Sequence, residues 1–158
     1  FYTGSAQCYS MINKQWLPQN WVTLGEELLL RYPNPLIILP GNSSKERAVA
    51  RQIYLKLNKD LRVQSFPNLS LIAMAALMEK SQLVIANDTG PSHIAKTLCP
   101  TLILKHALLT GDGWNTISGR AKLPNEHILV YAGDASRVAL DPEEVFQAAA
   151  GLLEKNDK

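Results

Sequence analysis

The chain has 158 residues and a mass of 17.5 kDa, enough for one domain with a hydrophobic core. Apolar residues make up 46% of it and charged residues 19%, a balance that excludes wholesale disorder. The net charge is only +2 and no basic stripe is visible, which argues against a nucleic-acid-binding protein. The longest apolar run, 71–78, is far shorter than the roughly 20 residues that cross a bilayer.

The cysteines and histidines give no sign of a metal site. Cys8 and Cys99 lie far apart and neither belongs to a CxxC pair, while the 3 histidines are scattered. We therefore expect two reduced thiols in a cytoplasmic protein. No basic segment followed by an apolar one opens the chain, so we expect no signal peptide.

The first half of the chain predicts helices in alternation with short strands. Residues 21–32 carry leucines at helical spacing and are stopped by Pro33. The apolar run 36–39 is typical of a strand buried on both faces, and Pro40-Gly41 ends it. A capped helix is predicted from Ser43 to about residue 58, followed by a weaker strand over 61–65.

The second half continues the alternation. It predicts a helix from about 70 to 80, a strand over 83–86, a helix over 91–98, strands over 101–104 and 128–131, and a helix over 141–153. Such alternation indicates right-handed βαβ units. We expect residues 1–158 to form a single three-layer, Rossmann-like α/β domain with a parallel sheet. The segment 106–127 is predicted to be long and irregular, as functional loops often are.

The segment 87–93 reads NDTGPSH and lies between a buried strand and a helix start. Pro91 suits the first helical position, and Thr89 or Gly90 suits the N-cap. The positive end of the helix dipole and the free N–H groups there favour an anion such as a phosphate. In an open parallel sheet, ligands bind beyond the carboxyl ends of the strands, which is where this segment falls.

The letters Asp-Thr-Gly also occur in aspartic proteases, but that chemistry requires two copies in an all-β framework. This chain has one copy in a βα turn. A plainer interpretation is that Asp88 and Thr89 only cap the helix and His93 finds a local partner.

Two other positions suit the same crevice. Glu46 lies at the start of a helix that follows a strand, where a carboxylate can accept hydrogen bonds from ribose hydroxyls. A role as the third residue of a capping box explains it equally well. A first strand is presumed near the start of the chain, and Ser10 and Lys14 lie in the loop between it and Trp16, where Lys14 can neutralise a diphosphate. A solvated lysine is the simpler explanation for that residue.

The ordered set of motifs resembles the C-terminal half of the heptosyltransferases, glycosyltransferase family 9. The match runs over roughly residues 4–105 and consists of Gly4, Lys14-Gln15-Trp16-Leu17-Pro18, Trp21, Gly41, Glu46, Leu69-Ser70-Leu71 and Asp88-Thr89-Gly90-Pro91-Ser92-His93. The chain departs from the family by the additional Leu17 and by Lys105-His106-Ala107-Leu108, where the family usually has a glycine-containing loop.

The resemblance implies one half of a GT-B glycosyltransferase that binds a nucleotide-diphosphate sugar, typically ADP-heptose, without a further cofactor or metal. Ser10 and Lys14 would contact the diphosphate or sugar, Glu46 the ribose and Leu69 the adenine, while Asp88, Thr89, Gly90 and His93 would form the phosphate turn. The resemblance implies no catalytic residue in this chain, because the general base and the glycolipid acceptor site belong to an N-terminal domain.

We therefore expect the fragment alone to be inactive. The whole enzyme would transfer a sugar, such as heptose, to lipopolysaccharide or another envelope glycan. It would be cytoplasmic and associate peripherally with the inner face of the cytoplasmic membrane. A non-catalytic nucleotide- or nucleotide-sugar-binding module and a nucleotide-sugar epimerase-like enzyme are the alternatives, because the same architecture can carry either.

Overall fold

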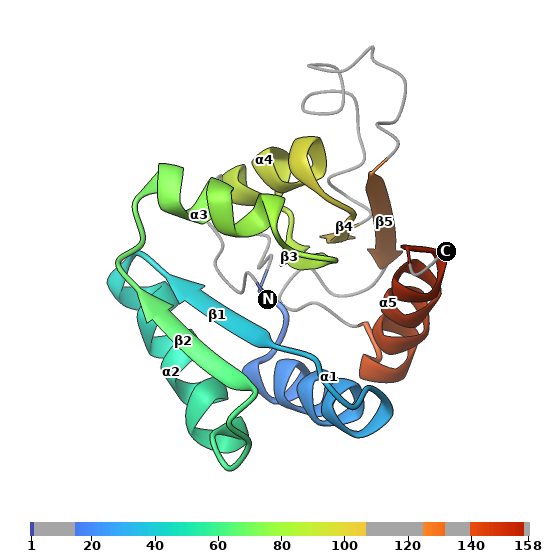
Figure 1. The fold of residues 1–158 in the computed structure, drawn as a ribbon, viewed down its shortest axis with the longest axis horizontal. Helices are drawn as coiled ribbons and strands as arrows, with labels where there is room; N and C mark the ends of the chain where they lie inside the picture. The colour runs from blue at the N-terminus through green and yellow to red at the C-terminus, as the bar shows by residue number, and fades with distance from the viewer. Residues whose placement is uncertain (2–14, 107–124, 132–139, 157–158) are drawn as a thin grey trace.

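A computed structural model describes residues 1, 15–106, 125–131 and 140–156 (Figure 1). Helices and strands alternate along the chain: α1 (Pro18–Arg31), β1 (Ile37–Gly41), α2 (Ser44–Leu57), β2 (Val63–Pro67), α3 (Leu71–Glu79), β3 (Val84–Asn87), α4 (Gly90–Leu98), β4 (Thr101–His106), β5 (Glu126–Tyr131) and α5 (Pro142–Asn156). In the described part of the chain, no helix is both long enough and apolar enough to span a bilayer.

The strands pair in parallel, which confirms the predicted α/β class. β1 pairs with β2, and β4 lies between β3 and β5. The described strands therefore form two hydrogen-bonded groups rather than the single sheet expected from the sequence. The carboxyl ends within each group lie at the same edge, since each pairing is parallel.

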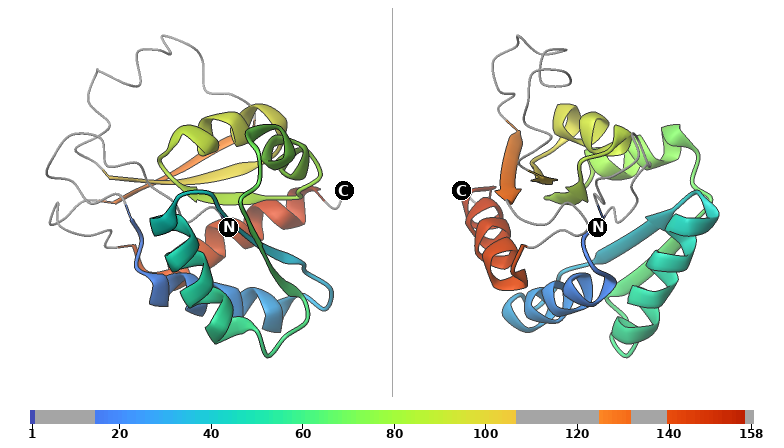
Figure 2. Two further views of the ribbon diagram at one scale, coloured as in Figure 1. Left: turned by 90° about the vertical axis from the view of Figure 1, so that its left-hand side faces the viewer. Right: turned by 180° about the vertical axis from the view of Figure 1, so that it is seen from behind.

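Helices cover both faces of the strands, which gives the three layers (Figure 2). α3 and α4 pack on one face over Met74, Met78, Val84, Ala86, Ala95 and Cys99. α1, α2 and α5 pack over the larger core on the other face, which includes Trp16, Trp21, Leu39, Ile53, Ile85, Leu102 and Val145. β3 contributes to both cores because successive strand side chains point to opposite faces.

The boundaries of several elements differ from the sequence prediction for local reasons. α1 begins at Pro18, three residues early, because proline is well suited to the first turn of a helix. β2 begins only at Val63, because Asp60 and Arg62 form a turn in which Oδ1 of Asp60 accepts from the Arg62 N–H at 2.9 Å. β4 reaches His106 and β5 starts at Glu126, so the segment predicted to be irregular is shorter at both ends.

Candidate functional site at the carboxyl ends of the strands

The segment 87–93 forms the connection between β3 and α4, as the sequence predicts. Asn87 ends β3, Asp88 follows it, and Thr89 is the N-cap of the nine-residue helix α4. The Asp88 N–H donates to the carbonyl oxygen of Leu104 at 3.3 Å, which joins this turn to β4. The start of α4 therefore lies at the carboxyl edge of the sheet, where ligands of parallel sheets bind.

Asp88 and His93 face each other across the first turn of α4. Nε2 of His93 lies 3.4 Å from Oδ1 of Asp88, and the imidazole is more exposed than the carboxylate, at 43% against 13% of the side-chain surface. The pair is an ion pair only when the imidazole is protonated. Asp88 thereby holds the exposed imidazole beside the helix N-terminus, a position from which His93 can contact a ligand.

The hydroxyl group of Thr89 is buried at the start of α4, and no hydrogen bond to it is found within the part of the chain that the structure describes. The Ser92 hydroxyl accepts from the Thr89 N–H at 3.1 Å and donates to the Thr89 carbonyl oxygen at 2.7 Å. Oγ1 of Thr89 occupies the acceptor position of a capping box with Ser92, but it is buried and forms no hydrogen bond of normal geometry among the described residues. Buried hydroxyl groups normally have a partner, so this atom marks a position where a bound group can supply one.

Gly90 is exposed at the first position of α4, and a Cβ atom built there meets nothing within 4 Å. The packing of the residues that the structure describes therefore does not demand glycine at this position. The N–H of Gly90 belongs to the first turn, whose N–H groups have no intrahelical acceptor. An anion can approach this backbone closely.

Trp16 ties the segment after Lys14 to this edge. Its backbone N–H donates to Oδ1 of the fully buried Asn87 at 3.2 Å, and its indole Nε1–H donates to the Leu140 carbonyl oxygen at 2.9 Å. Ser10 and Lys14 themselves lie outside the described residues. Their predicted contacts with a diphosphate or sugar therefore stay predictions.

Glu46 forms the capping box of α2. Its Oε2 accepts from the N–H groups of Asn42 and Ser43 at 3.0 and 2.9 Å, and Oγ of Ser43 accepts from the Glu46 N–H at 3.2 Å. This is the structural role that the sequence left open beside ribose binding. A carboxylate has lone pairs on two oxygens, so Glu46 can cap α2 and also accept a hydrogen bond from a ribose hydroxyl group.

Leu69 follows the carboxyl end of β2. It is partly buried and packs against the core beneath α3 and α4. Asn68 before it has a φ of 61°, a backbone conformation that asparagine tolerates better than most residues. The Asn68 N–H donates to the Gly41 carbonyl oxygen at 3.0 Å, and its Oδ1 accepts from Arg47 at 2.9 Å, which fixes this corner.

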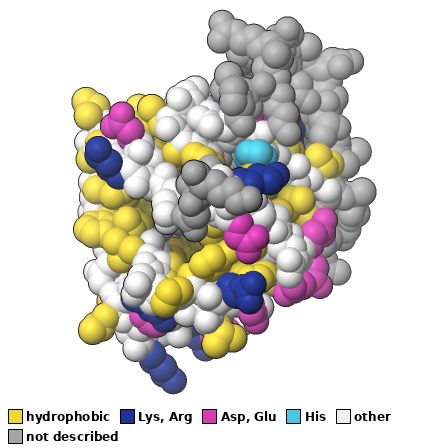
Figure 3. Space-filling model, turned by 45° about the vertical axis from the view of Figure 1, so that its right-hand side comes forward, with side chains coloured by type: hydrophobic (Ala, Val, Ile, Leu, Met, Phe, Trp, Pro, Cys, Tyr) yellow, Lys and Arg dark blue, Asp and Glu magenta, His cyan; other side chains and the backbone are white. Residues whose placement is uncertain are grey.

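The described site residues thus form two groups at carboxyl ends of strands. Asp88, Thr89, Gly90 and His93 surround the start of α4, while Glu46 lies in the first turn of α2 after β1 and Leu69 follows β2. On the face shown in Figure 3, lysine and arginine side chains are interspersed with acidic ones, as the sequence composition suggests.

Two residues at this edge were not among the predicted site residues. Asn87 anchors Trp16, and Lys105 on β4 is only 6% exposed and follows Leu104, whose carbonyl oxygen accepts from the Asp88 N–H. A charged residue at the end of the apolar strand sequence TLILKH is the signal that could have singled out Lys105. Among the described residues, no three histidine, cysteine or acidic side chains are grouped as a metal site.

The fold is shared with solved heptosyltransferases. The chain is similar to the E. coli ADP-heptose LPS heptosyltransferase II, with 18% identity and a TM-score of 0.75 over 99% of this chain and 46% of that one. It is also similar to E. coli heptosyltransferase WaaC, in a structure with ADP-2-deoxy-2-fluoro heptose (20% identity, TM-score 0.66) that covers 91% of this chain and 41% of that one. A second WaaC structure, with ADP, gives 19% identity and a TM-score of 0.65, covering 96% and 45%.

At these identities the structural likeness shows the fold alone, and the chain spans less than half of each of these proteins. A search of curated proteins finds no match. The family is shown by sequence: the model of glycosyltransferase family 9 (heptosyltransferase) matches residues 2–103, well over half of the chain. The chain therefore belongs to glycosyltransferase family 9, the heptosyltransferase family.

Proposed function

We propose that this chain is the donor-binding part of a glycosyltransferase and holds the diphosphate of a nucleotide sugar at the N-terminus of α4. The observation that carries the proposal is the buried Oγ1 of Thr89, which has no partner among the described residues and lies at a helix start on the carboxyl edge of a parallel sheet. A phosphate oxygen would accept from that hydroxyl and from the first-turn N–H of Gly90.

The neighbouring side chains suit the same ligand. His93, when protonated, adds a positive charge at the exposed end of the turn. Lys14 is two residues from Trp16, which is bound to Asn87 at the end of β3, so we assign Lys14 and Ser10 to the diphosphate or sugar. Glu46, in the first turn of α2, is assigned to the ribose, and Leu69, just after β2, is assigned to the base.

The proposed reaction is attack of an acceptor hydroxyl on the anomeric carbon of the donor sugar. A bond from the acceptor oxygen to that carbon forms, and the bond from the carbon to the diphosphate oxygen breaks. The helix dipole and Lys14 would stabilise the negative charge that develops on the departing nucleotide diphosphate. The acceptor proton would pass to a base supplied by another part of the enzyme, so this chain alone should bind the donor without turnover.

ADP is the first nucleotide to test, because the similar E. coli WaaC structures contain ADP and ADP-2-deoxy-2-fluoro heptose. We further propose that the whole enzyme glycosylates a lipopolysaccharide or similar glycolipid from the cytoplasmic side of the membrane. The altered Lys105-His106 segment leaves the identity of the sugar outside this proposal.

Titration calorimetry of the folded chain against ADP, UDP and GDP tests the donor site. We expect weak binding of ADP that falls roughly tenfold or more in Lys14→Ala, since each charge-assisted hydrogen bond contributes about 1.5–3 kcal/mol. Lys59→Ala, which removes an exposed lysine from a turn far along the chain, is the matched control. Failure of the folded chain to bind any of the three nucleotides would overturn the proposal.

A further inference from the structure

Lys105 lies near the carboxyl end of β4 and is only 6% exposed. Removal of an ammonium group from water is costly, so lysine is almost never fully buried unless negative groups balance its charge. The sequence departs from the family at this residue, and the donor contacts proposed above do not include it. Its burial at the edge where ligands of parallel sheets bind therefore needs a separate explanation.

The pairing of β3 with β4 places Lys105 beside Asp88. At the start of β3, the Val84 N–H donates to the Pro100 carbonyl oxygen. Four residues later in both strands, the Asp88 N–H donates to the Leu104 carbonyl oxygen. The parallel register of the two strands therefore continues one residue beyond the end of β3. At that step Asp88 lies opposite Lys105, and opposite residues of paired strands project from the same face of the sheet.

The first turn of α4 lies over this end of the strands. Ala86 belongs to the core beneath α3 and α4 and pairs with Ile103, so Lys105, two residues further along β4, lies on the face that α4 covers. Near the other end of the helix, Nζ of Lys96 donates to Oε1 of Glu126, the first residue of β5, at 2.7 Å. α4 therefore runs from the carboxyl edge to the amino edge, and its first turn is the part nearest to Lys105.

The charges around this turn favour a bound anion. The N-terminus of a helix carries a partial positive charge, so a basic side chain beside it is unfavourable unless a negative group is also present. Protonated Lys105 adds a positive charge, as does protonated His93, and the carboxylate of Asp88 can balance only one of them. The buried Oγ1 of Thr89, without a partner among the described residues, lies at the same turn. A diphosphate, with several negative charges and many acceptor oxygens, suits this set of groups.

We propose that Lys105 is a further binding residue for the donor and that its ammonium group contacts the diphosphate from the β4 side. Thr89 and Gly90 would contact the same diphosphate from the α4 side. The inference rests on the proposed function, since it adds one contact to the same ligand. It differs from it in assigning part of the affinity for phosphate to a residue on the strand next to the turn.

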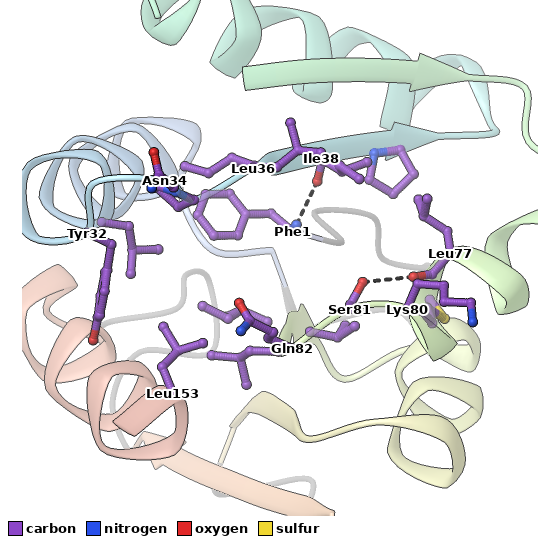
Figure 4. Close-up of a pocket in the computed structure, with 18 of the residues that line it drawn as sticks. Phe1, Tyr32, Asn34, Leu36, Ile38, Leu77, Lys80, Ser81, Gln82 and Leu153 are labelled. Atoms are coloured by element: carbon purple, nitrogen blue, oxygen red, sulfur yellow. Dashed lines mark hydrogen bonds between the residues drawn. The ribbon is translucent and has the colours of Figure 1, made fainter. Parts of the chain in front are cut away.

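Titration calorimetry with ADP on Lys105→Met and Lys105→Gln tests this contact. We expect both variants to bind ADP about tenfold or more weakly, because a charge-assisted hydrogen bond to the phosphate is lost. Lys80→Met is the matched control and should bind ADP as the parent chain does. Lys80 is exposed and lines a cavity of about 710 Å³ at the starts of β1 and β3, which none of the described site residues lines (Figure 4).

Thermal unfolding separates a ligand contact from support of the fold. Methionine and glutamine remove a buried charge and keep a side chain of similar length, so the melting midpoints should stay within about 2 °C of the parent chain or rise. A clear fall of the midpoint in both variants with unchanged ADP affinity would overturn the inference, because Lys105 would then be a structural residue.

A comparison of ADP with AMP shows whether Lys105 acts on the phosphate charge. Because Coulomb attraction grows with the charge of the ligand, Lys105→Met should weaken ADP binding several-fold more than AMP binding. An equal loss for the two nucleotides would show that Lys105 acts through the fold.

The same titrations distinguish failure of this inference from failure of the donor site. If the parent chain binds ADP and the two Lys105 variants bind it equally well, the inference is wrong and the donor site at α4 stands. A folded parent chain that binds no nucleotide would overturn both.

Discussion

The backbone N–H of Trp16 donates to Oδ1 of Asn87 at 3.2 Å, which joins two positions 71 residues apart at the carboxyl end of β3. Both residues are buried, and Asn87 has no exposed surface at all. This contact fixes the position of Trp16 relative to the end of β3. It therefore holds the segment that follows Lys14 next to the segment 87–93.

Asn87→Ala should lower the free energy of unfolding by roughly 1–3 kcal/mol, because the Trp16 N–H would then be buried without its acceptor. Urea denaturation measures this as a lower midpoint with an unchanged slope. Asn58→Ala, at an exposed helix end, is the matched control and should change stability by less than about 0.5 kcal/mol. Similar values for the two variants would show that the Trp16 contact contributes nothing to stability.

Thr89→Val separates ligand binding from folding. The hydroxyl group makes no hydrogen bond among the described residues, so its replacement by a methyl group should leave stability unchanged or raise it by up to about 1 kcal/mol. Affinity for ADP should fall about tenfold, since the phosphate loses a donor. In the control Thr97→Val, an exposed hydroxyl that donates to the Ile94 carbonyl oxygen is removed, and ADP affinity should stay the same. A loss of stability without a loss of affinity would contradict the proposed role of Thr89.

Two glycines should respond to alanine in opposite ways. A Cβ atom at Gly41 would lie 3.0 Å from both N and Cα of Arg47, so Gly41→Ala should destabilise the fold by about 1–3 kcal/mol. At Gly90 the same atom meets nothing within 4 Å, so Gly90→Ala should fold as well as the parent chain. We expect Gly90→Ala to bind ADP more weakly, because its methyl group would occupy the space over the first turn of α4. Unfolding curves and calorimetry on both variants decide this, and undiminished ADP binding by Gly90→Ala would count against the donor site.

Asp88 and His93 should be coupled more strongly in ligand binding than in stability. Their side chains are 3.4 Å apart and the imidazole is 43% exposed, so a double-mutant cycle with Asp88→Asn and His93→Gln should give a stability coupling of roughly 0–1 kcal/mol. The same cycle on ADP affinity should give a larger coupling if Asp88 positions His93 beside the phosphate. Equally small couplings in both measurements would leave the pair without a role in binding.

The turn formed by Asp60 and Arg62 before β2 should stabilise the fold at mildly acidic and neutral pH, and this contribution should be lost in strong acid. Hydrogen bonds from Arg62 hold the pKa of Asp60 at about 2, against 3.8 for the free side chain. Because the folded pKa is the lower one, the contribution is complete above about pH 4 and is lost as the pH falls toward 2. Asp60→Asn should therefore lower the melting midpoint by a few degrees at pH 5 and reduce its fall between pH 4 and 2. Glu154→Gln, an exposed acid, controls for the change in net charge.

Local signals in the sequence determined most of the helices and strands and the position of the turn between β3 and α4. Pro91 and the preceding apolar run predicted the junction of β3 and α4, and Ser43 with Glu46 predicted the capping box of α2. These features depend on residues three or four apart, whose conformational preferences do not require the rest of the chain. The order of the motifs also sufficed to indicate the family.

Only the tertiary structure decided which positions meet. The bond from Trp16 to Asn87, the buried hydroxyl of Thr89 without a partner and the separation of β1 from β3 depend on packing between distant segments. Strand pairing and side-chain burial depend on how the helices pack against both faces of the sheet. A short stretch of sequence holds no information on that packing. The sequence placed the turn between β3 and α4, and the structure determined what surrounds it.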